Sequence, residues 1–150
     1  NDGVIAGKIA AFEDQYQAQA VFIDQGYGTG VYSFGLTMGR QWRLVPFGSA
    51  SGKRGYANKR AEMWGTLRDW LRDGGVLEDG DVIHDDLIGP EAFVNAKGEI
   101  QLEKKEDMKR RGLPSPNEAD ALALTFAFPV LRRDADIGTA NTKYDLFKRR

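Results

Sequence analysis

The stretch Ala20-Val21-Phe22-Ile23-Asp24-Gln25-Gly26-Tyr27-Gly28-Thr29-Gly30 decides the fold that the sequence predicts. It opens with a continuous apolar run, which is typical of a central strand covered on both faces. Residues 3–19 upstream have apolar side chains at helical spacing, and Asp2 can cap that helix. A helix that leads into a buried strand predicts an α/β fold. The apolar stripe of the helix, which has to pack on another element, consists of Ile5, Ile9, Phe12 and Tyr16.

Further segments continue this alternation of helix and strand. Residues 31–38 predict a helix, and residues 42–47 predict a strand in which Pro46 is tolerated only at the end or on an edge. A loop rich in Gly and Ser follows at 48–57. Residues 58–73 predict a helix that Asn58 caps and that a glycine pair at 74–75 ends.

The second half of the chain contains a predicted hairpin and a predicted core helix. Residues 92–94 and 99–102 flank a short loop ending in Gly98, which is the pattern of a β-hairpin. Residues 76–90 are acidic and only loosely assigned, and residues 103–114 form a basic connection. The last helix is expected to begin at Ser115-Pro116-Asn117-Glu118, a capping box in which the Ser115 hydroxyl accepts from the Glu118 N–H.

The composition is that of an ordinary globular protein. A length of 150 residues suits one domain, and 41% hydrophobic with 29% charged residues is close to average. No apolar run approaches the ~20 residues needed to span a bilayer. There is no leader pattern, and the absence of cysteine excludes disulfides and thiolate metal sites. We expect no membrane partner, one domain at residues 1–130, and a polar tail at residues 131–150 that docks through Tyr144, Leu146 and Phe147.

The charge distribution gives weak functional signals. A formal net charge of -1 argues against a protein that coats nucleic acid by bulk positive charge. Basic residues gather at 104–111 and acidic residues at 78–86, and a solvated face explains either run as well as a binding site does. His84, the only histidine, lies in the acidic run and is expected on a surface loop; the run itself could still bind a cation weakly.

Asp24 follows the apolar run directly, so it is expected at the carboxyl end of a buried strand, where open α/β sheets bind ligands. A charged carboxylate there needs hydrogen-bond donors or a cation. The alternative is an aspartate that caps the following turn through backbone N–H groups. The glycines at 26, 28 and 30 complete no nucleotide-binding fingerprint, and we expect them to let the backbone turn tightly with positive φ.

Asp120 lies inside a helix that is apolar on nearly every side, which predicts a core helix. An acid in its first turns points either to the N-terminal helix dipole or to a bound cation. An aspartate that ends a core strand and one that begins a core helix together indicate a site for Mg²⁺ or Mn²⁺ built from oxygen ligands.

Four stretches of the sequence resemble one known family, the nuclease domains of tailed-phage (or prophage) terminase large subunits. They occur in the family's order and span roughly residues 20–130. The stretches are Val21-Phe22-Ile23-Asp24-Gln25-Gly26-Tyr27-Gly28-Thr29-Gly30-Val31, Tyr56-Ala57-Asn58-Lys59-Arg60-Ala61-Glu62-Met63-Trp64, Lys104-Lys105-Glu106-Asp107-Met108-Lys109-Arg110-Arg111-Gly112 and Ser115-Pro116-Asn117-Glu118-Ala119-Asp120-Ala121-Leu122-Ala123-Leu124-Thr125-Phe126-Ala127.

The resemblance implies a ribonuclease H-like fold, a mixed sheet flanked by helices, in which acids hold two Mg²⁺ or Mn²⁺ ions that activate water against a phosphodiester. The implied activity is that of a metal-dependent endonuclease that cuts concatemeric viral DNA during packaging. Asp24 and Asp120 match the family's metal-binding, catalytic acids. Lys105 resembles a phosphate-contacting residue, and Arg60 is either structural or a secondary DNA contact. The residues expected to contact double-stranded DNA are Lys104, Lys105, Lys109, Arg110 and Arg60.

The sequence departs from the family at its start. The family's first catalytic aspartate lies on an opening strand that precedes a helix like 3–19, and Asp2 at a helix start is no substitute. We therefore expect a nuclease domain truncated at its N-terminus, without the first strands and without the ATPase motor that would bind ATP. The portal protein and the small terminase subunit are the implied partners, and the implied setting is the host bacterial cytoplasm at the procapsid portal.

Two alternatives remain open at this point. The fold could have lost its site and serve as a docking or DNA-binding module of the packaging motor, which the missing acid supports. It could also be another ribonuclease H-like nuclease, such as a resolvase or integrase, although these would not share the stretches at 104–112 and 115–127.

Overall fold

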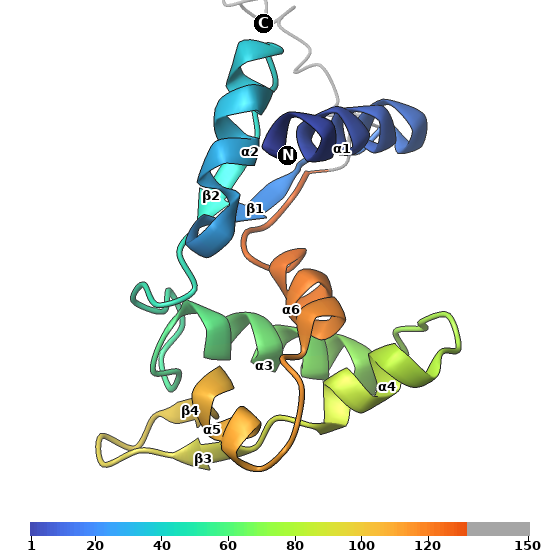
Figure 1. Ribbon diagram of the computed structural model, residues 1–150. Coiled ribbons are helices and arrows are strands. Elements are labelled where there is room, and N and C mark those ends of the chain that lie inside the picture. The colour runs from blue at the N-terminus through green and yellow to red at the C-terminus, as the bar shows by residue number, and fades with distance from the viewer. Residues whose placement is uncertain (132–150) are drawn as a thin grey trace, which may run out of the picture.

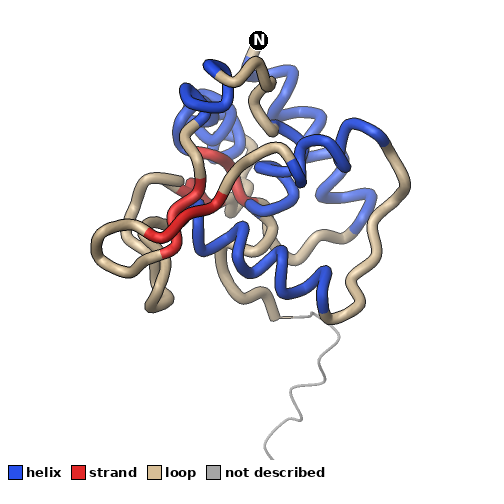
Figure 2. Tube along the Cα trace, turned by 90° about the horizontal axis from the view of Figure 1, so that it is seen from below, coloured by secondary structure: helices blue, strands red, loops and turns tan. Residues whose placement is uncertain are grey.

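The computed structural model describes residues 1–131 and has an α/β architecture (Figure 1). Figure 1 places the first four elements at one end and the remaining elements at the other. In chain order the elements are α1 (Asp2–Tyr16), β1 (Phe22–Asp24), α2 (Gln25–Thr37), β2 (Arg43–Val45), α3 (Lys59–Arg72), α4 (Asp81–Ile88), β3 (Ala92–Val94), β4 (Ile100–Leu102), α5 (Lys105–Arg110) and α6 (Asn117–Leu124). Short strands among longer helices are evident in Figure 2. The predicted tail contacts of Tyr144, Leu146 and Phe147 lie outside the described residues.

The described strands form two small sheets. β1 and β2 run parallel with Phe22 opposite Arg43 and Asp24 opposite Val45. β3 and β4 form the antiparallel hairpin expected from the sequence, and Gly98 at the end of its loop has φ of 77°. A mixture of parallel and antiparallel pairing is therefore present, as predicted, but within separate sheets.

The predicted first helix is confirmed, whereas its cap and its buried face were wrongly predicted. The side chain of Asn1 accepts from the N–H of Gly3, so Asn1 is the cap and Asp2 is the first helical residue. Most of the expected stripe is exposed, with Phe12 at 58% and Tyr16 at 71% of their maximal areas. The helix instead buries Ala6 and Ala10 against the elements around it, because small side chains let α1 and α2 approach closely.

The glycines after Asp24 have a different role from the one predicted. They lie inside α2, which begins at Gln25 rather than at residue 31, and none of them has positive φ. A Cβ at Gly28 would collide with the Ile23 side chain, and a Cβ at Gly30 would collide with the Asp2 carboxylate. These positions lack side chains because the neighbouring strand and α1 pack directly on them.

The larger core lies between α3 and α6. It is formed by Val45, Met63, Trp64, Leu67, Ala119, Ala123, Leu124 and Ala127. The predicted helix α3 begins as expected, since the Asn58 side chain accepts from the N–H of Ala61 at 2.9 Å. Helix α3 places Arg60 and Trp64 toward α6 on the face that also carries this core.

Helix α6 begins at Asn117, one residue later than predicted, and its predicted capping box is wrong. The Ser115 side chain makes no capping bond, and the residue before the helix is Pro116. The buried carboxylate of Asp86 on α4 caps the helix instead. Its Oδ2 accepts from the N–H groups of Glu118 (2.8 Å) and Ala119 (3.3 Å). An acceptor from another helix therefore satisfies donors that a local cap was expected to satisfy.

Two helices form where no helix or strand was firmly predicted, α4 within 76–90 and α5 within 103–114. His84 lies on α4 rather than on a loop, and its side chain is exposed as expected. Among the described helices, none combines the length and the apolar character that crossing a bilayer requires.

Candidate active site

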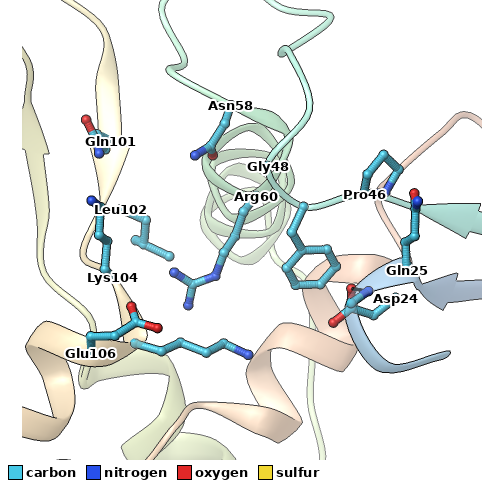
Figure 3. Close-up of a pocket in the computed structure, with 13 residues that line it drawn as sticks. Asp24, Gln25, Pro46, Gly48, Asn58, Arg60, Gln101, Leu102, Lys104 and Glu106 are labelled. Atoms are coloured by element: carbon cyan, nitrogen blue, oxygen red, sulfur yellow. Dashed lines mark hydrogen bonds between the residues drawn. The ribbon is translucent and has the colours of Figure 1, made fainter. Parts of the chain in front are cut away.

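A cavity of about 700 Å³ opens where five segments of the chain meet (Figure 3). The end of β1, the loop after β2, the start of α3, the end of β4 and the start of α5 contribute to its walls. Its charged lining residues are Asp24, Arg60, Lys104, Lys105 and Glu106. Four of the expected catalytic and DNA-binding residues thus border the same cavity: Asp24, Arg60, Lys104 and Lys105.

Asp24 is the last residue of β1 and the N-cap of α2. Its Oδ1 accepts from the Gly26 N–H at 2.9 Å. The capping alternative considered from the sequence is therefore what the structure contains, and it leaves the carboxylate on the cavity wall. Since only one of its oxygens takes part in this bond, the other is available to a ligand in the cavity.

Asp120 is buried, with 5% of its area exposed, and three side chains contact its carboxylate, two of them positively charged. Its Oδ1 accepts from Arg60 Nε at 3.0 Å and from Trp64 Nε1 at 2.8 Å. The Lys105 ammonium lies 2.8 Å from Oδ2. Side chains of α3 and α5 therefore balance this carboxylate, a role that the sequence analysis assigned to a helix dipole or to a cation.

Arg60 spans the wall between Asp120 and the β4–α5 connection. Its Nη1 donates to the backbone carbonyl of Glu103 at 2.9 Å, and its Nη2 is buried without a hydrogen-bond partner among residues 1–131. Because 91% of the surface area of Arg60 is buried, a structural role fits this residue better than a contact with DNA. Lys105 borders the cavity together with Asp24 and pairs with Asp120, whereas Asp120 itself is not one of the residues that line the cavity.

The remaining basic candidates are distributed along α5. Lys104 precedes the helix and lines the cavity. Lys109 and Arg110 are exposed in its last turn and do not border the cavity, and Arg110 pairs with Asp107 at 2.7 Å. The sequence cluster at 104–111 is thus divided between the cavity and the outer surface.

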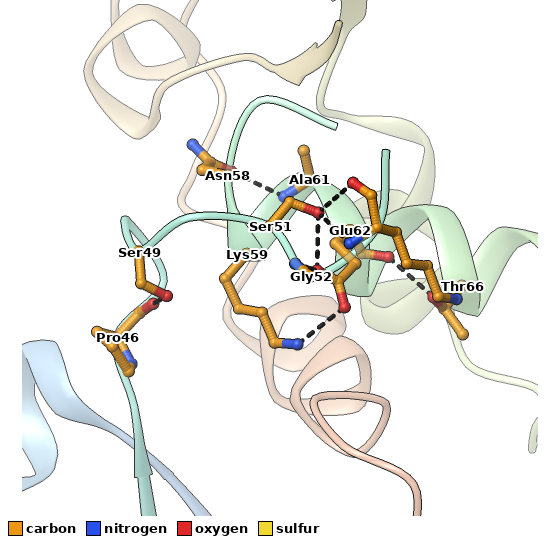
Figure 4. Close-up of polar contacts among 10 residues, drawn as sticks. Pro46, Ser49, Ser51, Gly52, Asn58, Lys59, Ala61, Glu62 and Thr66 are labelled. Atoms are coloured by element: carbon orange, nitrogen blue, oxygen red, sulfur yellow. Dashed lines mark hydrogen bonds and ion pairs between the residues drawn. The ribbon is translucent and has the colours of Figure 1, made fainter. Parts of the chain in front are cut away.

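The loop that forms one wall of the cavity is fastened to α3 by a buried carboxylate (Figure 4). Glu62 accepts from the Ser51 hydroxyl at 2.8 Å, from the Gly52 N–H at 2.6 Å and from the Lys59 ammonium at 2.8 Å. Burial alone would raise the pKa of Glu62, but the bonds from Lys59, Ser51 and Gly52 outweigh it and lower the pKa below its ordinary value. The wall is therefore held in place by a charge that stays ionised at neutral pH.

Trp64 and Asp86 are contacts of the site that the sequence analysis missed. The position of Trp64, one turn after Arg60 on a predicted helix, was the only available signal that both could face the same partner. Within residues 1–131 no three acidic or histidine side chains come close enough to hold a metal ion together. The acidic run at 78–86 therefore brings no three such side chains together in the described part of the chain.

Comparison with solved structures identifies the class of fold. The chain has the fold of ribonuclease H-like nuclease domains found in terminases, which confirms the predicted fold class. One match is a lysine-to-alanine variant of the nuclease domain of the large terminase subunit gp2 of bacterial virus Sf6 with manganese, at 20% identity and a TM-score of 0.65. It covers 83% of this chain and 72% of that chain.

Two further structures of the same Sf6 subunit match in the same way. A variant with calcium has 23% identity and a TM-score of 0.62, covering 83% of this chain and 71% of that chain. The nuclease domain of gp2 itself has 21% identity and a TM-score of 0.61, and the match covers 83% of this chain and 72% of that chain. No protein-family model and no curated protein sequence matches the chain. At these identities the likeness establishes the fold, and it agrees with the family resemblance of the four sequence stretches.

Proposed function

We propose that this chain is part of a metal-dependent endonuclease of a viral DNA-packaging terminase large subunit, which cuts concatemeric viral DNA by phosphodiester hydrolysis with two metal ions. The observation that carries the proposal is the cavity that Asp24 borders together with Arg60 and Lys105, the two residues that pair with Asp120. Its fold is that of nuclease domains, one of which contains manganese.

The donor set fits Mg²⁺ or Mn²⁺ in part. Asp24 has one oxygen outside its capping bond, and Asp120 Oδ2 is buried without a directed hydrogen bond among the described residues. Oxygen ligands of this kind suit hard divalent cations. When bound, the ions would activate water and stabilise the leaving oxygen. Since two carboxylates are too few for two ions, the site needs at least one further acidic ligand.

The basic side chains would hold the DNA. Lys104 lines the cavity, and Lys109 and Arg110 are exposed farther along α5, so all three can contact phosphates of a duplex, Arg110 from its exposed pair with Asp107. Phosphate contacts of this kind position a duplex without reading its sequence. Lys105 pairs with Asp120 and has a third of its side chain exposed, so it can also turn toward a phosphate at the cavity. The portal protein and the small terminase subunit are the proposed partners, in the cytoplasm of the bacterial host.

The proposal is tested by Mn²⁺-dependent plasmid cleavage with the full-length protein and with Asp24→Asn and Asp120→Asn. Both substitutions preserve shape, and an asparagine at 120 still offers an oxygen to Arg60 and Trp64. We expect both to abolish cleavage, whereas Asp85→Asn, which changes an exposed aspartate on α4, leaves cleavage unchanged. Undiminished cleavage in either site variant would refute the assignment.

A non-catalytic docking or DNA-binding module is the second candidate. It is favoured by the absence of three close acids in the described residues and by the pairing of Asp120 with three side chains of the protein itself. Isothermal titration with Mn²⁺ separates the two functions, because a docking module requires no ion. DNA binding without Mn²⁺ binding would support this second candidate.

A further inference from the structure

The two oxygens of the Asp120 carboxylate have different surroundings. Oδ1 accepts two hydrogen bonds, from the Trp64 indole at 2.8 Å and from Arg60 Nε at 3.0 Å. Oδ2 has an ion pair with Lys105 at 2.8 Å, but no hydrogen bond of good geometry among residues 1–131. A carboxylate oxygen offers about two lone pairs, so Oδ1 is saturated and Oδ2 is not.

The donors to Oδ1 are themselves held rigidly. Arg60 and Trp64 lie one turn apart on α3, and each has 9% of its area exposed. Arg60 is fixed a second time by the Glu103 carbonyl, and Trp64 packs in the core between α3 and α6. Both donors are therefore held in place by contacts that do not depend on the orientation of the Asp120 carboxylate.

We infer that Trp64 and Arg60 are positioning residues for the proposed metal site. They hold Asp120 so that Oδ1 stays with α3 and only Oδ2 can bind a metal ion, which then takes the place of the Lys105 ammonium. The inference rests on the proposed function, because it takes Asp120 as a metal ligand. Partners of this kind typically change metal affinity by 10–100-fold when they are removed, because the ligand then has to be oriented at the expense of binding.

The chain offers a matched control for Trp64. Trp70 lies on the same helix and is partly buried, whereas Trp64 is buried, and the Trp70 ring packs on Phe126 at a centroid distance of 5.7 Å. Trp64→Phe removes the indole N–H and keeps an aromatic ring, and Trp70→Phe makes the same change away from Asp120. We expect Trp64→Phe to weaken Mn²⁺ binding about tenfold in isothermal titration, and Trp70→Phe to leave it unchanged.

A measurement on the unmodified protein tests the same inference without a substitution. Its three tryptophans, Trp42, Trp64 and Trp70, give three indole N–H signals in an ¹H–¹⁵N spectrum. Substoichiometric Mn²⁺ should broaden the Trp64 signal first. In saturating Mg²⁺ the Trp64 indole N–H should remain as protected from hydrogen exchange as in the metal-free protein, since Oδ1 keeps its donors.

The outcomes separate this inference from the proposed function. If the unmodified protein binds no Mn²⁺, or if the Trp42 signal broadens first, the proposed metal site is wrong and the inference fails with it. If the protein binds Mn²⁺ at Asp120 but Trp64→Phe binds it equally well, only the positioning role is overturned. Loss of indole protection on Mg²⁺ binding would overturn it too, because the ion would then have displaced the hydrogen bond to Oδ1.

Discussion

Asp86 is predicted to stabilise the helix that carries Asp120. Its carboxylate accepts from the N–H groups of Glu118 and Ala119, and Ala119 is fully buried. Replacing a helix cap by alanine typically costs ~1 kcal/mol. A buried N–H left without an acceptor costs ~1–3 kcal/mol, and this applies to Ala119, because Glu118 is an exposed residue. Asp86→Ala should therefore lower the free energy of unfolding by about 2 kcal/mol, or the melting temperature by roughly 6 °C.

Urea denaturation followed by tryptophan fluorescence measures this difference. Asp85→Ala is the matched control, because the neighbouring aspartate has 78% of its side chain exposed. Asp86→Asn keeps an acceptor and loses only the charge near the helix terminus, so it should cost less than about 1 kcal/mol. The reasoning is refuted if Asp86→Ala is within about 0.5 kcal/mol of Asp85→Ala, the range of ordinary surface substitutions.

Other predictions concern Glu62, which fastens the cavity-wall loop to α3, and the packing of α2. Glu62→Gln should lower the unfolding free energy by about 3 kcal/mol at neutral pH, because it leaves the buried Lys59 without its counter-charge. The folded-state pKa of Glu62 is lowered, so this stabilisation is present above the ordinary pKa of 4.5 and is lost as the pH falls through the folded value. Urea denaturation should find that the variant and the parent converge in acid, and a constant difference would contradict the prediction. Gly28→Ala should cost about 2 kcal/mol, because the new Cβ meets Ile23. Gly7→Ala, with open space around it, should gain about 0.5–1 kcal/mol in the same assay, and equal effects of the two would contradict the packing argument.

The elements that the sequence predicted well are those with local signals. Helix α3 has an apolar face of helical period and an Asn58 cap that bonds only three residues ahead. The hairpin has a short loop closed by Gly98. Such features depend on neighbouring residues, so they are visible in one sequence without knowledge of the tertiary fold.

The features that the sequence did not predict depend on distant partners. The cap of α6 comes from Asp86, which is separated from Glu118 by 32 residues, so the local capping box was preferred and was wrong. The donors to Asp120 are separated from it by 60 and 56 residues. Asp24 and Asp120 themselves could be chosen from their apolar surroundings, because a charge in such a place needs a partner. Which side chains would be the partners could not be predicted from the neighbouring residues in the sequence.

The geometry of the candidate site depends mainly on the first two turns of α3. Glu62 holds the cavity-wall loop there, and Arg60 and Trp64 hold Asp120. The Asp86 cap also contributes to this geometry. It fixes where α6 begins and therefore where Asp120 lies along α3. Since the carboxylate is restrained by two independent helix contacts, a substitution at Asp86 should also disturb the Trp64 indole hydrogen bond, although α4 does not border the cavity. If Asp86→Ala lowered stability and left the Trp64 indole signal and its protection unchanged, the position of Asp120 would be set by α3 alone.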